Sequence, residues 1–375
     1  MPALLPDIDA DGLLEFSVVF TDRSLNHMSA AFQGVMRDIS ALLREVYRAD
    51  GVALVPGGGT YAMEAVARQL ANGQKAMVIR NGWFSYRWTQ IFEAGGIPAE
   101  EMVMKARRTG NAPDAPFTPA PIEEVTERIR AEAPSAVFAP HVETSAGMIL
   151  PDDYLRAVAD ATHEVGGLFV LDCIASGCVW VDMEATGVDV LISAPQKGWS
   201  ASPSAGLVML SERALARVRD TQSTSFAVDL GKWLQIMEAY EAGGHAYHAT
   251  MPTDALRGFR DAMLEAKSWG FDRLKTAQWA QGDRVRAALG ARGFRSVAAD
   301  GFGAPGVVVS YTDNAEIHSG RAFASHGVQI AAGVPLMVDE GPDYKSFRIG
   351  LFGIDKLKDV DASVSRLEDV LDQVV

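Results

Sequence analysis

Residues 187–199 read Gly-Val-Asp-Val-Leu-Ile-Ser-Ala-Pro-Gln-Lys-Gly-Trp, a short apolar run that passes into a polar loop. The apolar run predicts a buried strand, so Lys197 lies just beyond the end of that strand. An earlier apolar run, residues 167–171, ends in the same way at Asp172. Continuous apolar strands are typical of parallel sheets, and the carboxyl ends of parallel strands form the edge where ligands bind. We therefore expect Lys197 and Asp172 on neighbouring strand ends.

The rest of the chain alternates between helical periodicity and short apolar strands from about residue 29 to about residue 220. This alternation predicts an α/β protein with a mostly parallel sheet that helices cover on both faces. Beyond Phe294 the order of elements changes, which predicts a smaller α+β domain. We expect a large domain over residues 1–265 and a small C-terminal domain over residues 266–375. The predicted strands are 52–55, 76–79, 136–139, 167–171, 187–192, 205–210, 306–310, 328–331 and 346–350. The predicted helices are 29–49, one from 61, one from 85, 122–131, 152–165, 252–289 with a break near Gly270, 315–326 and 360–374.

Composition limits the class of partner and the compartment. The 375 residues include 34 basic and 48 acidic side chains, a formal charge of −14 that argues against nucleic acid or an anionic membrane as a partner. The two cysteines, Cys173 and Cys178, form neither a disulfide framework nor a zinc pattern, so we expect buried free thiols. The N-terminus lacks the features of a secretory signal, and no stretch approaches the roughly 20 apolar residues that span a bilayer. We expect a cytoplasmic protein.

A glycine-rich loop follows the first predicted strand. Pro56-Gly57-Gly58-Gly59-Thr60 precedes a helix, and the amides at a helix N-terminus together with the Thr60 hydroxyl suit a phosphate monoester. The loop matches neither the dinucleotide fingerprint nor the P-loop. A glycine turn that permits tight packing between strand and helix is the alternative interpretation.

Two more loops follow predicted strand ends. Trp83 and Phe84 suit stacking on a flat heteroaromatic ring, although large aromatics are more often core residues. The hydroxyls of Thr144 and Ser145 either bond a ligand or cap a turn. A lysine, a carboxylate, an anion loop and an aromatic side chain at one sheet edge indicate a site for pyridoxal 5′-phosphate (PLP). There the lysine holds the cofactor as a Schiff base, and the carboxylate keeps the pyridine nitrogen protonated.

These motifs resemble those of the class V aminotransferases of PLP fold type I, specifically the alanine–glyoxylate and serine–glyoxylate aminotransferase group. The resemblance runs from about residue 27 to the end of the chain. It implies that Lys197 and Asp172 are catalytic, since Gln196 and Lys197 match the family's Gln-Lys pair and Asp172 matches its V-D-S-V-A-S aspartate. These three residues are also expected to bind the cofactor. The other expected cofactor-binding residues are Gly58, Gly59 and Thr60, which match the small-Gly-His loop, Phe84, which matches the stacking tryptophan, and Thr144 and Ser145, which match the E-S/T-S-x-G segment.

Two C-terminal segments extend the resemblance. Residues 247–252 resemble the family's Y-H-x-T-x-P, which implies a homodimer with its active site at the interface, where Tyr247 and Thr250 reach the cofactor phosphate of the neighbouring subunit. Residues 346–353 resemble F/W-R-I-G-x-x-G, which implies that Arg348 binds the substrate carboxylate. An arginine within an apolar strand itself requires an anionic partner, and a structural salt bridge is the other possibility.

The resemblance implies an aminotransferase that moves an amino group between a small amino acid and a small 2-oxo acid of the glyoxylate or pyruvate type. The chain departs from the family in three places. Thr60 replaces a histidine, Phe84 stands at the position of the stacking tryptophan, and residues 16–27 replace a Pro-Gly-Pro segment. Within that segment, Arg23 and His27 either read a polar group on the substrate or lie in solvent.

Two rival functions stay open. A PLP-dependent lyase or desulfurase shares the fold, but a histidine precedes the lysine of desulfurases, whereas Gln196 does so here. A non-catalytic module for a phosphorylated metabolite is the second rival. We expect no metal site, because no carboxylate or cysteine accompanies His245 and His248. The remaining histidines on predicted helices are expected to face solvent: His163, His318 and His326.

Overall fold

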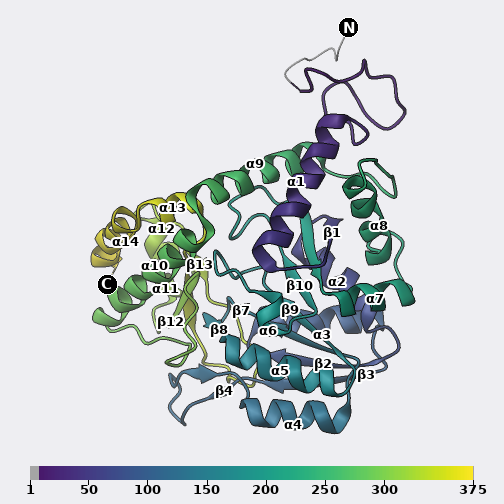
Figure 1. The fold of residues 1–375 in the computed structure, drawn as a ribbon. Helices are drawn as coiled ribbons and strands as arrows, with labels where there is room; N and C mark the ends of the chain where they lie inside the picture. The colour runs from purple at the N-terminus through teal and green to yellow at the C-terminus, as the bar shows by residue number, and fades with distance from the viewer. Residues whose placement is uncertain (1–7, 375) are drawn as a thin grey trace.

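A seven-stranded sheet forms the centre of the computed structural model, which describes residues 8–374 (Figure 1). Across the sheet the strands are β1 (Gly51–Pro56), β11 (Ala205–Leu210), β10 (Val190–Ser193), β9 (Leu168–Asp172), β6 (Ala136–Pro140), β2 (Lys75–Arg80) and β3 (Glu100–Lys105). β11 pairs antiparallel with both of its neighbours, and the other pairings are parallel. The predicted α/β class and mostly parallel sheet are confirmed.

Helices flank this sheet and bury one face each (Figure 1). α1 shows how the sequence produces such a helix. The Ser29 hydroxyl accepts a hydrogen bond from the Phe32 amide at the N-terminus, and Arg48 ends the helix in a left-handed conformation. Its apolar side, which includes Phe32, Ile39 and Leu43, is buried, and each large side chain so buried contributes roughly 2 kcal/mol. The helices up to residue 270 are α1 (Ala30–Tyr47), α2 (Gly59–Leu70), α3 (Trp83–Gly95), α4 (Ile122–Glu132), α5 (Asp152–Glu164), α6 (Met183–Thr186), α7 (Glu212–Asp220), α8 (Leu230–Glu241) and α9 (Thr253–Trp269).

The C-terminal part contains a second, three-stranded sheet, in the order β12 (Val307–Tyr311), β14 (Ser346–Gly350) and β13 (Ala331–Ala332). The predicted break at Gly270 is confirmed, since a φ of 94° there separates α9 from α10. The single helix predicted over 315–326 is wrong, because Gly320 adopts a φ of 81° and divides it. The helices of this part are α10 (Phe271–Ala291), α11 (Ala315–His318), α12 (Arg321–Ala324), α13 (Ile354–Lys358) and α14 (Val360–Val374).

Several helices and strands of the structure were not predicted from the sequence. β3, α7 and α8 are absent from the predicted elements, as are two short hairpins, β4 (Arg107–Arg108) with β5 (Phe117–Thr118) and β7 (Val142–Glu143) with β8 (Met148–Ile149). Strand 328–331 was predicted too early, because the pairing with β14 involves residues 331 and 332. The described residues include no helix that is long and apolar enough to cross a membrane.

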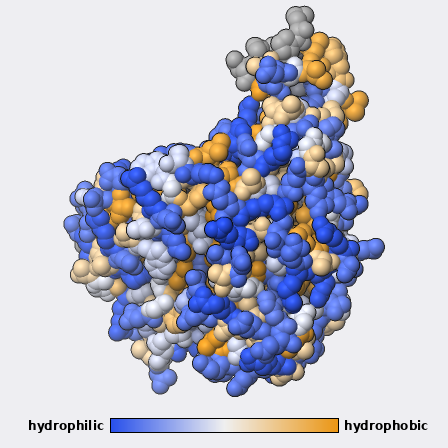
Figure 2. All heavy atoms as spheres, in the orientation of Figure 1, coloured by the Kyte–Doolittle hydropathy of each residue, from blue (hydrophilic) through white to orange (hydrophobic). Residues whose placement is uncertain are grey.

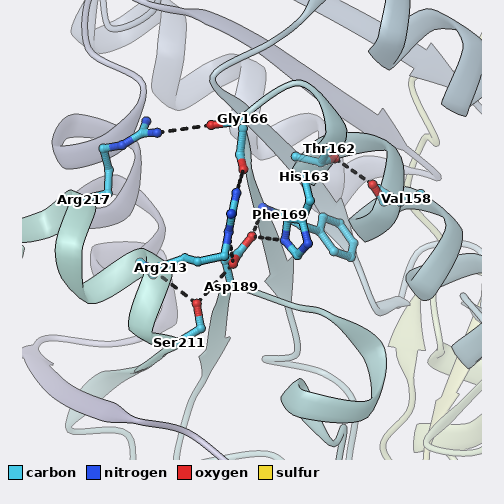
Figure 3. Close-up of polar contacts among 11 residues, drawn as sticks. Val158, Thr162, His163, Gly166, Phe169, Asp189, Ser211, Arg213 and Arg217 are labelled. Carbon is cyan, nitrogen blue, oxygen red and sulfur yellow. Dashed lines mark hydrogen bonds and ion pairs between the residues drawn. The ribbon is translucent and has the colours of Figure 1, made fainter.

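A buried carboxylate ties the amino-terminal ends of the sheet strands to two helices (Figure 3). Asp189, which precedes β10, is 1% exposed. It accepts hydrogen bonds from the Phe169 amide at 2.8 Å and the Ser211 hydroxyl at 3.1 Å, and its Oδ2 lies 2.8 Å from His163 Nε2. The expectation that His163 faces solvent is therefore wrong. Because its partners belong to α5, β9 and the start of α7, Asp189 joins elements that are distant in the sequence.

The Asp189→Ala substitution is expected to lower the free energy of unfolding by about 3 kcal/mol, because it leaves buried donors without an acceptor. A thermal denaturation midpoint lower by roughly 5 °C checks this expectation. Asp160→Ala is the matched control, since Asp160 is exposed on α5. An equal, small effect of both substitutions would contradict the stabilising role of Asp189.

Candidate active site

A cavity of about 460 Å³ lies at the carboxyl edge of the central sheet. Its walls come from the starts of α2 and α3, from the loops after β9 and β10, and from β14 of the C-terminal sheet. Segments distant in the sequence thus meet around one space. The cavity brings together eight residues that the sequence analysis selected: Gly59, Thr60, Phe84, Thr144, Asp172, Gln196, Lys197 and Arg348.

Asp172 and Lys197 face this cavity because their strands are neighbours. β9 and β10 pair in parallel, with Ile192 opposite Asp172, so the residues that follow β10 leave the sheet beside the aspartate. Asp172 Oδ1 accepts a hydrogen bond from the Ile174 amide at 2.9 Å. The pKa of Asp172 is raised to about 7, chiefly by burial and also by the Glu143 carboxylate, while the hydrogen bond from the Ile174 amide and the charge of Arg87 oppose the rise. The carboxylate therefore requires a cationic partner in the cavity to stay ionised.

Lys197 forms no ion pair with any residue of the described range 8–374. Its Nζ lies 5.1 Å from the centroid of the Phe352 ring. Burial lowers the pKa of this lysine, and the positive charges of Arg348 and Arg87 lower it further. A lysine with a lowered pKa has a larger neutral fraction and is a better nucleophile. The amine is thus suited to react with an aldehyde.

The glycine loop presents the N-terminus of α2 to the cavity. Gly57 adopts a φ of 122°, and Gly58 precedes the helix without a side chain to cap its first amides. A Cβ atom on Gly59 would collide with Ile174, which follows Asp172 and Cys173 in the chain. Both interpretations of the loop therefore apply: the glycines permit close packing, and they leave the helix N-terminus open to an anion.

A second buried carboxylate fixes the start of α3. Glu143 accepts hydrogen bonds from the amides of Phe84 and Ser85, at 3.2 and 2.8 Å, and from the Ser145 hydroxyl at 2.7 Å. The Ser145 hydroxyl also accepts from the Trp83 amide at 2.9 Å. Ser145 is not on the cavity wall, because its hydroxyl is occupied in holding α3. The sequence analysis did not select Glu143, although it begins the segment that carries Thr144 and Ser145.

Three other selected residues lie away from the wall. Gly58 is half-buried beside it, while Tyr247 and Thr250 are exposed, with 3.4 Å between their hydroxyl oxygens. His27 neither lies in solvent nor lines the cavity, because it is buried and stacks on Phe20, with 5.4 Å between the two ring centroids. Arg23 is exposed.

Two cavity residues were missed by the sequence analysis. Arg87 lies one helical turn after Phe84 on α3, and Phe352 follows β14. The spacing of Phe84 and Arg87 was a usable signal, because residues three apart share a helix face. The position of Phe352 depends on how the C-terminal part packs against the sheet, which no local pattern reveals.

The donor and acceptor groups of the cavity fit PLP. A carboxylate, an amine and an open helix N-terminus correspond to the pyridine nitrogen, the aldehyde and the phosphate of the cofactor. Gln196 contributes a buried side-chain oxygen, Oε1, that has no hydrogen-bond partner within residues 8–374. The residues that would hold PLP are Gly59, Thr60, Phe84, Thr144, Asp172, Gln196 and Lys197.

The raised pKa of Asp172 makes the stability of the cofactor-free protein depend on pH. The carboxyl of the unfolded chain ionises near its ordinary pKa of about 4, so the folded state binds more protons between pH 4 and 7. Relative to an Asp172→Asn variant, the wild type should therefore lose stability as the pH rises through this window, by at most about 4 kcal/mol. Thermal midpoints of both proteins at about pH 5 and about pH 8 measure the change, and a constant difference would contradict it.

Comparisons with known proteins agree with this geometry. No protein-family model matches the chain. It is 27% identical to alanine–glyoxylate aminotransferase 1 of Saccharomyces cerevisiae, over 88% of this chain and 86% of that protein. The aspartate aminotransferase of Thermus thermophilus has a similar structure, with a TM-score of 0.74 and 27% identity over 94% of each chain.

One relative carries a different name. The chain is 26% identical to a protein of Synechococcus sp. named as the small subunit of a soluble hydrogenase, over 92% of this chain and 87% of that protein. Residues 8–374 contain no group of three or more His, Cys, Asp or Glu side chains that could bind a metal ion. The other homologues and structural neighbours of the chain include the alanine–glyoxylate aminotransferases, which are class V PLP-dependent enzymes of fold type I, and the side chains at the carboxyl edge of the sheet agree with such enzymes.

Proposed function

We propose that the protein transfers an amino group between a small amino acid and a small 2-oxo acid of the glyoxylate or pyruvate type. The observation that carries the proposal is the meeting of Lys197, Asp172 and Arg348 around one cavity. The cavity volume of about 460 Å³ must accommodate cofactor and substrate together, which favours a small substrate. The name of the yeast relative, an alanine–glyoxylate aminotransferase, is in keeping with substrates of this size.

Lys197 and Asp172 divide the proton chemistry between them. PLP supplies an electron sink for the charge that remains when the C–H bond of the amino acid breaks. Lys197 Nζ would accept the proton from the substrate α-carbon and hold it for return to the bound cofactor and substrate. The Asp172 carboxylate would stabilise a protonated pyridine nitrogen, a cationic partner that this buried acid lacks in the free protein.

Arg348 orients the substrate. Its Nε donates to the Ala332 carbonyl at 2.8 Å, and it forms no ion pair with any side chain in residues 8–374. Burial lowers the pKa of this guanidinium, and no salt bridge within residues 8–374 compensates for that burial. The remaining N–H groups suit a bidentate pair with the substrate carboxylate. Such a pair holds the α-carbon so that its hydrogen points toward Lys197.

The cysteines argue against the desulfurase alternative. Cys173 and Cys178 are both buried, as predicted, and neither is on the cavity wall. Burial raises the pKa of both thiols, whereas a nucleophilic cysteine requires a thiolate. Free thiols are also compatible with a location in the reducing cytoplasm, which we include in the proposal.

The proposed active unit is a homodimer. Tyr247 and Thr250 are exposed and do not reach the cavity of their own subunit, which leaves them available to a second copy. Tyr61, on the first turn of α2, is also exposed beside the glycine loop. The segment before α1 projects from the body (Figure 1) and carries exposed apolar side chains (Figure 2), among them Leu13 and Phe16. Exposed apolar surface of this kind is typical of an interface.

The function is tested by half-reactions. The purified protein with PLP should show a visible absorbance band, and an amino acid added alone should convert the cofactor to its pyridoxamine form, whereas a lyase would leave the band in place. Lys197→Ala should lose turnover and the band that borohydride removes. Arg348→Lys should keep the band while the KM for the amino acid rises about 100-fold, because the bidentate contact is lost. A wild type that gains no band with PLP would contradict the proposal.

The dimer is tested by complementation between subunits. A Tyr247→Phe/Thr250→Val variant should bind PLP at least about tenfold more weakly, because two phosphate contacts are lost. Mixed dimers with Lys197→Ala subunits should regain one site of wild-type affinity, formed by the intact lysine of one copy and the intact hydroxyls of the other. A fully active monomer in sedimentation experiments, or mixed dimers without recovery, would refute the shared site.

A further inference from the structure

Arg87 is a cation on the cavity wall that lacks an acidic partner. It is half-buried on α3, and no carboxylate within residues 8–374 lies within ion-pair distance of it. The basic side chains of a larger surface hollow near β3 differ in this respect, because Lys105 pairs with Asp339 and Arg107 pairs with Glu124. Arg87 is thus a cation of the cavity wall whose charge no ion pair within the described residues balances.

The contacts of Arg87 place its guanidinium at the glycine loop. Its Nη1 donates to Thr60 Oγ1 at 3.2 Å, and its guanidinium lies 5.2 Å from the centroid of the Phe84 ring. Thr60 is the second residue of α2, so the guanidinium lies beside a helix N-terminus. The helix dipole makes that end positive, and a cation is unfavourable there unless an anion lies between the two. The arrangement is thus suited to an anion in contact with both.

The glycine loop alone does not neutralise the negative charge of a phosphate monoester. Such a group carries a charge of about −1.5 to −2 at neutral pH, while the helix N-terminus supplies roughly half a positive charge. Residues 56–60 add a hydroxyl and no charged side chain. The wall carries three cations, Lys197, Arg348 and Arg87. The first two serve the aldehyde and the substrate carboxylate in the proposed function, which leaves Arg87 for the phosphate.

We propose that Arg87 is the charged anchor of the cofactor phosphate, which it binds together with the first amides of α2 and the Thr60 hydroxyl. The inference rests on the proposed PLP chemistry and assigns the phosphate site a cation outside the glycine loop. A planar guanidinium pairs with two phosphate oxygens at once. The same contact holds the start of α3 against the start of α2 and so keeps Phe84 beside the cofactor ring.

The test compares PLP with pyridoxal, which has the same ring and aldehyde but no phosphate. Affinities of the cofactor-free wild type and of Arg87→Gln for both compounds are measured by absorbance titration. Arg87→Gln should weaken PLP binding by about 10- to 100-fold, as expected for a charge-assisted hydrogen bond, and should change pyridoxal binding by less than about threefold. Pyridoxal also controls for the influence of Arg87 on the Lys197 amine, since that influence acts on both compounds alike.

Two further variants make the result specific. Arg87→Lys keeps the charge without the bidentate geometry, so its PLP affinity should lie between those of the wild type and Arg87→Gln. Arg156→Gln removes an exposed arginine of α5 that does not line the cavity, and it should leave both affinities unchanged. Inorganic phosphate should compete with PLP more weakly in Arg87→Gln than in the wild type.

The outcomes separate this inference from the proposed function. A wild type that binds neither compound overturns the proposed function and the inference with it. A wild type that binds PLP, with Arg87→Gln unchanged or with PLP and pyridoxal weakened equally, overturns only the role of Arg87 as a phosphate anchor. A raised KM for the amino acid at unchanged PLP affinity assigns Arg87 to the substrate and overturns the inference as well.

Discussion

The parallel pairing of β9 with β10 is the constraint on which the site depends. It places Asp172 at the end of one strand and sends the chain from the next strand into the loop that carries Lys197. The separation of acid and amine is thereby set by the spacing between strands, about 4.8 Å, and by the length of one loop. Every other group of the site is arranged around this pair, from the starts of α2 and α3 on one side and from β14 on the other.

The cavity concentrates charges that the free protein does not neutralise. Arg87, Lys197 and Arg348 face a common space, and none of them has a carboxylate partner in the described part of the chain. Burial and then the charges of Arg348 and Arg87 lower the pKa of Lys197, and burial raises the pKa of Asp172. In the proposed function, a cofactor with a cationic ring nitrogen and an anionic phosphate, together with a carboxylate substrate, neutralises these charges. The groups that destabilise the free protein are then the groups proposed to bind its ligands, as is common at functional sites.

The sequence was informative where a local pattern dictates structure. Apolar strands followed by polar loops predicted the sheet and the edge where Asp172, Lys197 and Phe84 meet. The role of Glu143 was not predictable, because its partners at the start of α3 lie 58 or more residues away in the chain. Likewise, the burial of His27 depends on its contacts with His245 and Tyr247. Gly320 was visible in the sequence, but its left-handed conformation, which divides a helix, was not.

Asp189 and the cavity lie at opposite ends of the same strand, β10. The carboxylate holds the amino-terminal end through α5 and the start of α7, while the opposite end opens onto the cavity. Substitutions of residues on the cavity wall therefore leave the cross-links made by Asp189 intact. Because stability and the cavity depend on residues at opposite ends of β10, substitutions that change the substrate need not unfold the protein. This separation makes the chain a suitable starting point for directed evolution of amine-transferring catalysts.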